Sequence, residues 1–219
     1  APALVKLEAY RSVHSVVARF IKDPHLRQAF SFHTLLVGGN PFSTSSIYAL
    51  IHALERRGGV WFAKGGTNAL VSGMVALFER LGGRLRLNAR VARVETEGAR
   101  ATGVTLSDGT RLAADMVASN ADVMHSYRDL LGGTRRGRTK AALLKRQRWS
   151  MSLFVVHFGL SQRPEGLAHH TILFGPRYRE LVNEIFKGPK LAEDFSLYLH
   201  SPSVTDDSLA PPGMSTHYV

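Results

Sequence analysis

Four pairs of adjacent glycines divide the first 83 residues and limit the length of any helix there. The pairs are Gly38-Gly39, Gly58-Gly59, Gly65-Gly66 and Gly82-Gly83. Glycine readily adopts the left-handed backbone that ends a helix or closes a tight turn, and it disfavours a helix interior. We therefore expect this region to form helices of limited length, separated by turns.

Apolar residues recur at helical spacing between these glycine pairs. Asp23-Pro24 has the sequence of a helix start, because Asp caps a first turn and Pro fits it without losing a hydrogen bond. We predict helices over Val13–Phe20, from Pro24 to Gly38, from about Ser43 to Arg57, and from Thr67 to Leu81.

Strand patterns begin after the third helix and return near the end of the chain. Short strands are predicted at 60–62, 84–88, 91–97 and 101–107, followed by a two-residue hairpin turn at Asp108-Gly109 and a buried strand over 115–120. Residues 121–148 read as helical. Strands are predicted again at 151–160, 171–174, 195–201 and 214–219, with a helix over 178–186. The fold class predicted is α+β or α/β.

The charge is strongly positive, with a formal net value of +11. Seven cations and no acid occur between Arg135 and Arg148. The cluster is explained by a solvated basic helix, by contact with anionic lipid headgroups, or by nucleic-acid binding. No aromatic platform or nucleic-acid motif accompanies it, so a nucleic-acid partner is not expected. No segment approaches the ~20 apolar residues that span a bilayer.

Several familiar catalytic and metal-binding motifs are absent. The chain has no Cys, no G-x-G-x-x-G or P-loop, no H-E-x-x-H and no G-x-S-x-G. His169 and His170 are adjacent, and neighbouring side chains of a strand point to opposite faces. We therefore expect that they do not share a metal ion, and no metal site is predicted.

The stretch from Phe62 to Asp122 carries the most informative motifs. It contains F-x-K-G-G-T, L-N-A-R-V-x-R-V, G-V-T-L-x-D-G-T and A-D-M-V-A-S-N-A-D in this order. This order resembles the second FAD-domain segment of the flavin-dependent amine oxidase and carotenoid desaturase superfamily. The resemblance implies that the backbone of Val91 contacts the adenine of FAD and that Gly65 and Gly66 approach the active site. Strand packing at Val91 and turn geometry at the glycines would equally explain these residues.

Further stretches resemble the bacterial-type phytoene desaturases, and the resemblance covers essentially the whole chain. They lie at residues 25–33, 37–42, 45–48, 59–62, 167–171 and 174–178. Against that family the chain reads as an internal fragment, without the N-terminal dinucleotide fingerprint and without a C-terminal segment that closes the FAD site. The resemblance implies a helical substrate or membrane-associated region at 1–57, a FAD-domain segment at 58–125 and part of a substrate domain at 126–219.

The resemblance also implies the chemistry. FAD takes a hydride from phytoene, a C40 polyene precursor, a proton leaves the neighbouring carbon, and a quinone or oxygen reoxidises the flavin. An apolar substrate needs an apolar channel, for which Phe30, Phe32, Phe42 and Tyr48 are candidates, although ordinary helical core explains them too. The expected location is peripheral, on the cytoplasmic face of an anionic membrane. No catalytic acid or base is assigned.

Two alternatives remain at this stage. The chain could belong to another flavin-dependent enzyme resembling the amine oxidases. It could also be a basic lipid-binding module without catalysis, which the charge favours and the ordered pattern of helices and strands disfavours. Binding of FAD separates the two classes.

Overall fold

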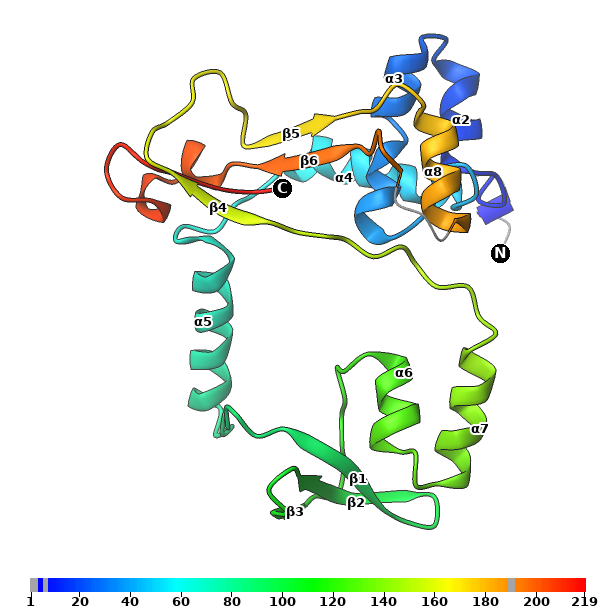
Figure 1. Ribbon diagram of the computed structural model, residues 1–219, viewed down its shortest axis with the longest axis vertical. Helices are drawn as coiled ribbons and strands as arrows, with labels where there is room; N and C mark the ends of the chain where they lie inside the picture. The colour runs from blue at the N-terminus through cyan, green and yellow to red at the C-terminus, as the bar shows by residue number, and fades with distance from the viewer. Residues whose placement is uncertain (1–3, 6–7, 189–191) are drawn as a thin grey trace. The chain divides into compact units, whose positions relative to one another are not determined.

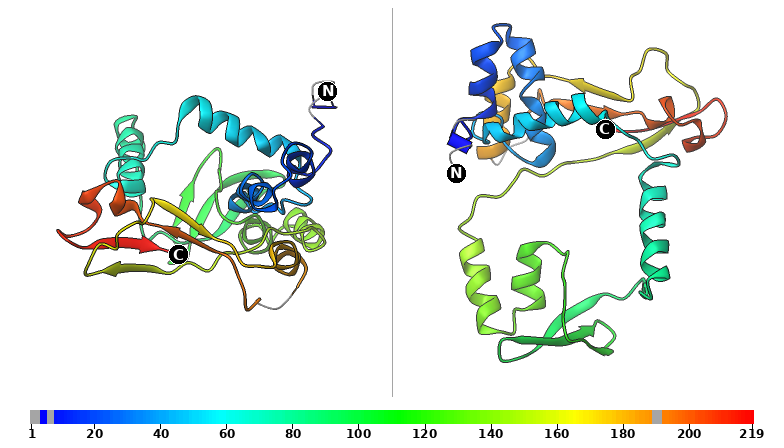
Figure 2. Two further views of the ribbon diagram at one scale, coloured as in Figure 1. Left: turned by 90° about the horizontal axis from the view of Figure 1, so that it is seen from above. Right: turned by 180° about the vertical axis from the view of Figure 1, so that it is seen from behind.

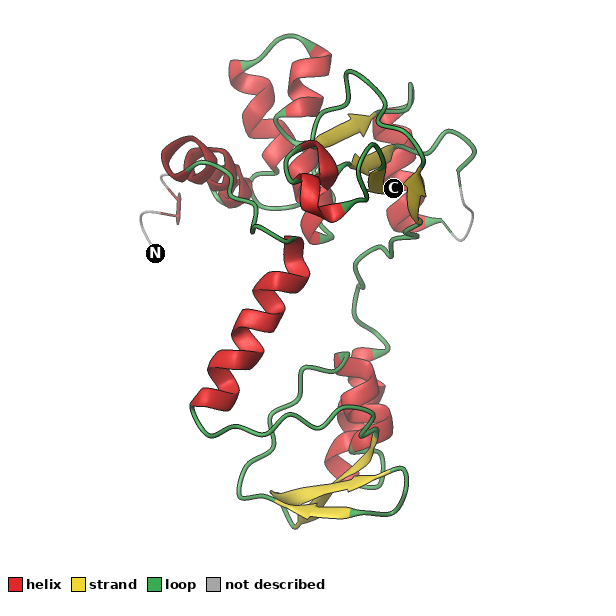
Figure 3. Cartoon of the chain, turned by 90° about the vertical axis from the view of Figure 1, so that its left-hand side faces the viewer, coloured by secondary structure: helices red, strands yellow, loops and turns green. Residues whose placement is uncertain are grey.

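The computed structural model describes residues 4–5, 8–188 and 192–219. The chain forms two compact units, one made of Ala1–Met74 together with Ser150–Val219, and one made of Val75–Trp149. Helices and strands occur in both units (Figure 3). Among the described residues, no helix is both long and apolar enough to cross a membrane. The predicted boundaries at residues 57 and 125 stay a prediction.

The first unit begins with short helices, as the glycine pairs indicate (Figure 1). They are α2 (Val13–Phe20), α3 (Pro24–Ala29), η1 (Phe32–Val37), η2 (Ser46–Ala49) and α4 (Leu50–Gly58). Asp23 caps α3 as predicted, because its carboxylate accepts a hydrogen bond from the Leu26 N–H at 2.9 Å. Gly38 ends η1 with a φ of 75°, and Gly59 ends α4 with a φ of 73°.

The helix predicted from Pro24 to Gly38 is wrong, because it is broken at Ser31. This residue is fully buried, and its hydroxyl donates to the Arg27 carbonyl at 2.7 Å. A serine bonded to its own backbone competes with the helical ladder, and the chain continues as the tighter 3-10 helix η1. The helix predicted from Ser43 likewise begins three residues later, where Ser45 caps η2.

The sheet of the first unit has four antiparallel strands in the order β4-β7-β6-β5. They are β4 (His157–Leu160), β5 (His170–Leu173), β6 (Leu197–His200) and β7 (Ser215–Tyr218). All four were predicted, although β4 is shorter than expected. Helix α8 (Tyr178–Lys187) follows β5, and the short helices η4 (Pro202–Val204) and η5 (Asp207–Leu209) separate β6 from β7.

Helix α8 supplies the core of this unit and lies beside the N-terminal helices (Figure 2). Leu181 and Val182 are each 1% exposed, and Val13 of α2 is fully buried. The ring of Tyr178 packs edge-on against Phe42 at 5.7 Å, and burial raises the pKa of its hydroxyl to about 12. Burying such side chains stabilises a fold by ~1.5–3 kcal/mol each.

Helix α5 (Gly66–Arg80) leads from the first unit into the second. The second unit has the antiparallel sheet β1 (Val91–Glu97), β2 (Arg100–Leu106) and β3 (Arg111–Ala113). It continues through α6 (Val123–His125), the π-helical turn η3 (Ser126–Leu130) and α7 (Arg135–Leu144). Leu130 and Ala141 are buried between these elements.

Three short strands predicted from the sequence are absent from the described structure. Residues 60–62, 84–88 and 115–120 are irregular. Asn88 has a φ of 55°, which bends the backbone, and Met116 is 84% exposed. None of these segments pairs with a strand in the part of the chain that is described, and an apolar run without a partner cannot form a ladder.

The β2–β3 hairpin has a three-residue loop instead of the predicted two-residue turn. The Leu106 N–H donates to the Thr110 carbonyl at 2.8 Å, which leaves Ser107, Asp108 and Gly109 in the loop. Only Gly109 has a positive φ, of 86°. A two-residue type I′ turn would need positive φ at Asp108 as well, so the single glycine selects the longer loop.

Gly103 in β2 gives the first testable prediction. It has a φ of 150° beside a register shift, and a Cβ added there would lie 2.2 Å from the Leu112 carbonyl oxygen of β3. Gly103→Ala should therefore separate β3 from β2 and destabilise the second unit by about 2 kcal/mol or more. Hydrogen exchange over residues 100–113 measures this. Gly133→Ala is the matched control, since nothing lies within 4 Å of the added Cβ. Equal protection in both variants would contradict the prediction.

Candidate functional site

A row of ring side chains crosses all four strands of the first unit's sheet. His170 of β5 is paired with His200 of β6, His200 with Tyr218 of β7, and Tyr218 with His157 of β4. Directly opposed residues lie on the same face of a sheet. The ring centroids are 5.2, 4.5 and 5.4 Å apart along the row. Strand register therefore gathers imidazoles and phenols at one end of the sheet.

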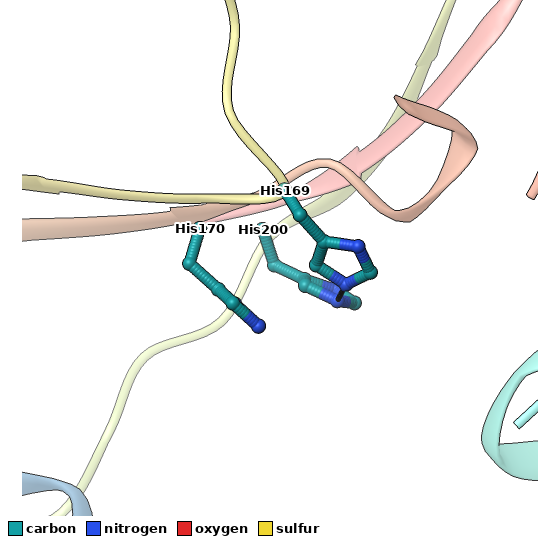
Figure 4. A group of neighbouring side chains, drawn as sticks. All are labelled: His169, His170 and His200. Atoms are coloured by element: carbon teal, nitrogen blue, oxygen red, sulfur yellow. Dashed lines mark hydrogen bonds between the residues drawn. The ribbon is translucent and has the colours of Figure 1, made fainter. Parts of the chain in front are cut away.

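His169 joins this row and completes a histidine cluster, which we define as His169, His170 and His200 (Figure 4). The Nε2 atoms of His169 and His200 are 2.8 Å apart, and one nitrogen from each of the three rings lies within 4.8 Å of the others. The expectation that His169 and His170 face opposite sides is wrong. His169 lies in the bend before β5, where the alternation of strand side chains does not apply.

Two of the three rings, those of His169 and His170, are oriented by a hydroxyl group close to Nδ1. His169 Nδ1 lies 2.5 Å from the Thr205 hydroxyl, and His170 Nδ1 lies 2.6 Å from the Tyr198 hydroxyl. His200 is 9% exposed, and its Nδ1 has no hydrogen-bond partner in the described part of the chain. The cluster therefore turns ring nitrogens toward one another while hydroxyl groups fix the outer sides of two rings.

Two histidines of the cluster, His169 and His200, have lowered pKa values. Burial, followed by the neighbouring His169 and His170, lowers the pKa of His200 to about 4. Burial, followed by His170, lowers the pKa of His169 below its ordinary value. A positive charge is disfavoured where imidazoles face one another away from water. The neutral rings of His169 and His200 therefore each keep one nitrogen lone pair, which is able to bind a metal ion.

The predicted glycine turn lies beside this cluster. Phe62, just before the turn, packs its ring edge-on against His169 at 4.7 Å. Gly65 and Gly66 have φ values of 80° and 75°, and the Gly65 N–H donates to the Asp206 carboxylate at 2.7 Å. A Cβ at Gly66 would lie 3.3 Å from Leu209. The turn geometry expected for both glycines is confirmed, while a contact with FAD stays a prediction.

The four candidate channel residues do not gather around one cavity in the described structure. Phe32 packs on Phe174, and Phe42 packs on His14 and Tyr178 with the Arg179 guanidinium 3.9 Å from its ring centroid. Phe30 and Tyr48 are 43% and 39% exposed. A shallow hollow on α4 includes Phe30 and none of the other three. Their role as a substrate channel stays a prediction.

Val91 is the first residue of β1 in the second unit. It is half-buried and pairs with Leu106, with a register shift between Val91 and Arg93. The hollow found in this unit is lined by later residues of β1 and by η3, and does not include Val91. Strand packing thus accounts for Val91, and its contact with adenine stays a prediction.

The basic cluster between Arg135 and Arg148 lies on and just after α7. All seven cations are exposed. None of them forms an ion pair within the described residues, although the Arg138 guanidinium donates to the Gly132 and Gly133 carbonyls. This segment therefore offers an uncompensated positive surface to an anionic partner.

Comparison with known proteins assigns the class. The model of the flavin containing amine oxidoreductase family matches residues 1–219, and the chain belongs to this family. It is 79% identical over 219 residues to a lycopene-forming phytoene desaturase of a Paracoccus species, and 61% identical to one from Pantoea ananas. It is 44% identical to a neurosporene-forming phytoene desaturase of Rhodobacter capsulatus.

The chain spans less than half of these relatives. The three alignments cover 100% of this chain and 44%, 44% and 42% of the respective relatives. A solved oxidoreductase from Methanosarcina mazei matches 95% of this chain and 46% of its own, with a TM-score of 0.65 and 18% identity. That structure supports the partial amine oxidase-type fold alone.

Asp206 gives the second prediction. Its pKa lies below the ordinary value of 3.8, because the Ser208 hydroxyl and the Gly65 N–H donate to its charged form. Because the pKa is lowered, the hydrogen bonds to the Asp206 carboxylate stabilise the folded state fully above about pH 3.8. This stabilisation is lost as the pH falls through the lower pKa that Asp206 has in the folded state. Asp206→Ala at pH 7 should therefore speed amide exchange at Gly65 about ten-fold or more.

The matched control is the neighbouring Asp207→Ala. Asp207 pairs with Arg163 at 2.6 Å and does not bind the glycine turn. Exchange at Gly65 should remain near that of the unmodified protein in this variant. An equal rise in both variants would show that the loop, and not the Asp206 carboxylate, holds the turn.

Proposed function

We propose that the protein containing this chain is a phytoene desaturase that uses FAD to form lycopene. The observation that carries the proposal is the 79% identity over the whole chain to a lycopene-forming phytoene desaturase. Two further lycopene-forming relatives are 62% and 61% identical, whereas the neurosporene-forming relatives are 44% identical. This order favours the lycopene-forming reaction. Membership in a flavin containing family supports FAD as the cofactor.

Two parts of this chain support the proposal of a flavin site. Gly65 and Gly66 have positive φ values that a side chain disfavours, and the family resemblance implies that this turn approaches the flavin. Val91 begins a strand whose backbone would contact the adenine, as the family resemblance implies. When bound, FAD would supply the hydride acceptor, and a quinone or oxygen would reoxidise it. The protein's part is orientation and exclusion of water.

The desaturase proposal is tested on the full-length protein with FAD and phytoene in liposomes. Coloured lycopene, measured by its visible absorption and dependent on FAD, is expected. Gly66→Ala should lower FAD content and rate about ten-fold, because the left-handed turn is strained and Leu209 is crowded. Gly109→Ala is the control. Gly109 has a similar φ in a solvent-exposed hairpin, and nothing lies within 4 Å of an added Cβ, so this variant should retain its FAD content and its rate.

Two results would contradict the proposal. Oxidation of an amine in place of phytoene would assign the protein to another flavin-dependent oxidoreductase. A full-length protein that binds no FAD would favour a basic lipid-binding module without catalysis.

We also propose peripheral attachment to an anionic membrane, on the cytoplasmic face. Seven exposed cations on and after α7, without an acid among them, support this, and phytoene is an apolar molecule that partitions into bilayers. A cation near an anionic surface contributes ~1 kcal/mol, so the cluster could contribute several kcal/mol.

Vesicles with and without an anionic phospholipid test the membrane proposal. Binding to anionic vesicles should weaken as salt rises from ~0.05 to ~0.5 M, because the Debye length shortens. Replacing Arg135, Arg136 and Arg138 with Gln should lower the affinity by roughly 100-fold, from ~1 kcal/mol each. The control replaces Arg84, Arg86 and Arg90, three exposed cations outside the cluster. Equal losses would assign the binding to net charge and contradict a role for the cluster.

A further inference from the structure

The histidine cluster has the composition of a transition-metal site. His169, His170 and His200 come from the start of β5 and the end of β6, and each offers one nitrogen within 4.8 Å of the other two. In a tetrahedral zinc site with bonds of ~2.0–2.1 Å, ligand nitrogens are about 3.3 Å apart. The 2.8 Å between His169 Nε2 and His200 Nε2 requires only a small separation to reach this value.

The third ligand is reachable from solvent. His170 is exposed on the edge strand β5, which gives a metal ion a route of entry, and its ring is held at Nδ1 by the Tyr198 hydroxyl. The backbone is already fixed, because the Ser201 N–H donates to the His169 carbonyl at 2.8 Å and β5 pairs with β6. Only side-chain motion is needed to bring three nitrogens around one ion.

The outer sides of the rings also match a metal site. Histidines that bind a metal commonly donate their other ring N–H to an oxygen, which fixes the tautomer. The Thr205 hydroxyl lies 2.5 Å from His169 Nδ1, and the Tyr198 hydroxyl lies 2.6 Å from His170 Nδ1. If both hydroxyls accept from Nδ1–H, the Nε2 lone pairs of these two histidines are directed to the interior of the cluster.

We propose that His169, His170 and His200 bind one divalent transition-metal ion of the zinc class. Imidazole nitrogens suit Zn²⁺ and disfavour Mg²⁺ and Ca²⁺, which prefer oxygen. Three protein ligands leave a fourth position for water or a small anion. The ion would join the start of β5 to the end of β6, beside the Phe62 ring. The proposal is independent of the desaturase reaction.

The test uses the full-length protein without an affinity tag, purified with a chelator and dialysed against Zn²⁺. Metal analysis should find one equivalent of Zn²⁺ in the unmodified protein and none in the His170→Gln and His200→Gln variants. The affinity of each variant for Zn²⁺ should be at least ten-fold weaker than that of the unmodified protein. His25→Gln, which removes an exposed histidine of α3, should keep that equivalent. Thr205→Val should weaken Zn²⁺ about ten-fold, the effect of losing the group that orients a ligand. Mg²⁺ should not compete.

Three outcomes overturn the proposal. The first is no Zn²⁺ equivalent in the unmodified protein. The second is unchanged binding in His170→Gln, whose exposed side chain can be replaced without loss of folding. The third is an equal loss in His25→Gln. Each would leave the cluster as a hydrogen-bonded group of histidines without a metal ion. Since Zn²⁺ content is measured without phytoene, a negative result here does not bear on the proposed reaction.

Discussion

The hydrogen bond from the Gly65 N–H to the Asp206 carboxylate joins segments that are 141 residues apart in the chain. It fixes the start of α5 against the loop that follows β6. Phe62 then lies on His169 and His200, and Thr205 lies against His169. The charged carboxylate makes this a stronger acceptor than a neutral oxygen would be. The contacts of Phe62 and Thr205 with the histidine cluster therefore depend on a hydrogen bond between one backbone N–H and a single carboxylate.

Local signals predicted much of the fold. Asp23-Pro24, Gly38 and Gly59 mark helix ends as expected, since capping depends on a few neighbouring residues. The strands β5, β6 and β7 were also predicted. The errors occurred where the outcome depends on distant partners. Residues 84–88 and 115–120 have strand-like sequences but find no partner strand in the described structure, and Ser31 breaks a helix by turning its hydroxyl inward.

The site was only partly accessible from the sequence. The glycine turn at Gly65-Gly66 was found because glycine pairs are visible in any sequence. His200 and Asp206 were missed, because only the β5–β6 register and the loop after β6 bring them near residues 62–65. His169 and His170 were noticed and then set aside by the alternation rule, which fails one residue before the strand. The Tyr198-x-His200 spacing on one strand face was the available signal.

The first unit is built from two stretches of chain, with residues 75–149 inserted between them. On the ribosome, Phe42 is made long before Tyr178, the ring against which it packs in that unit. At ~5–20 residues per second, synthesis of the intervening ~140 residues takes roughly 7–28 seconds. During that interval the helices α2 to α4 have no strands or α8 to cover them. The inserted unit is contiguous, so it can close first, while the N-terminal helices wait for the strands and α8 to be made.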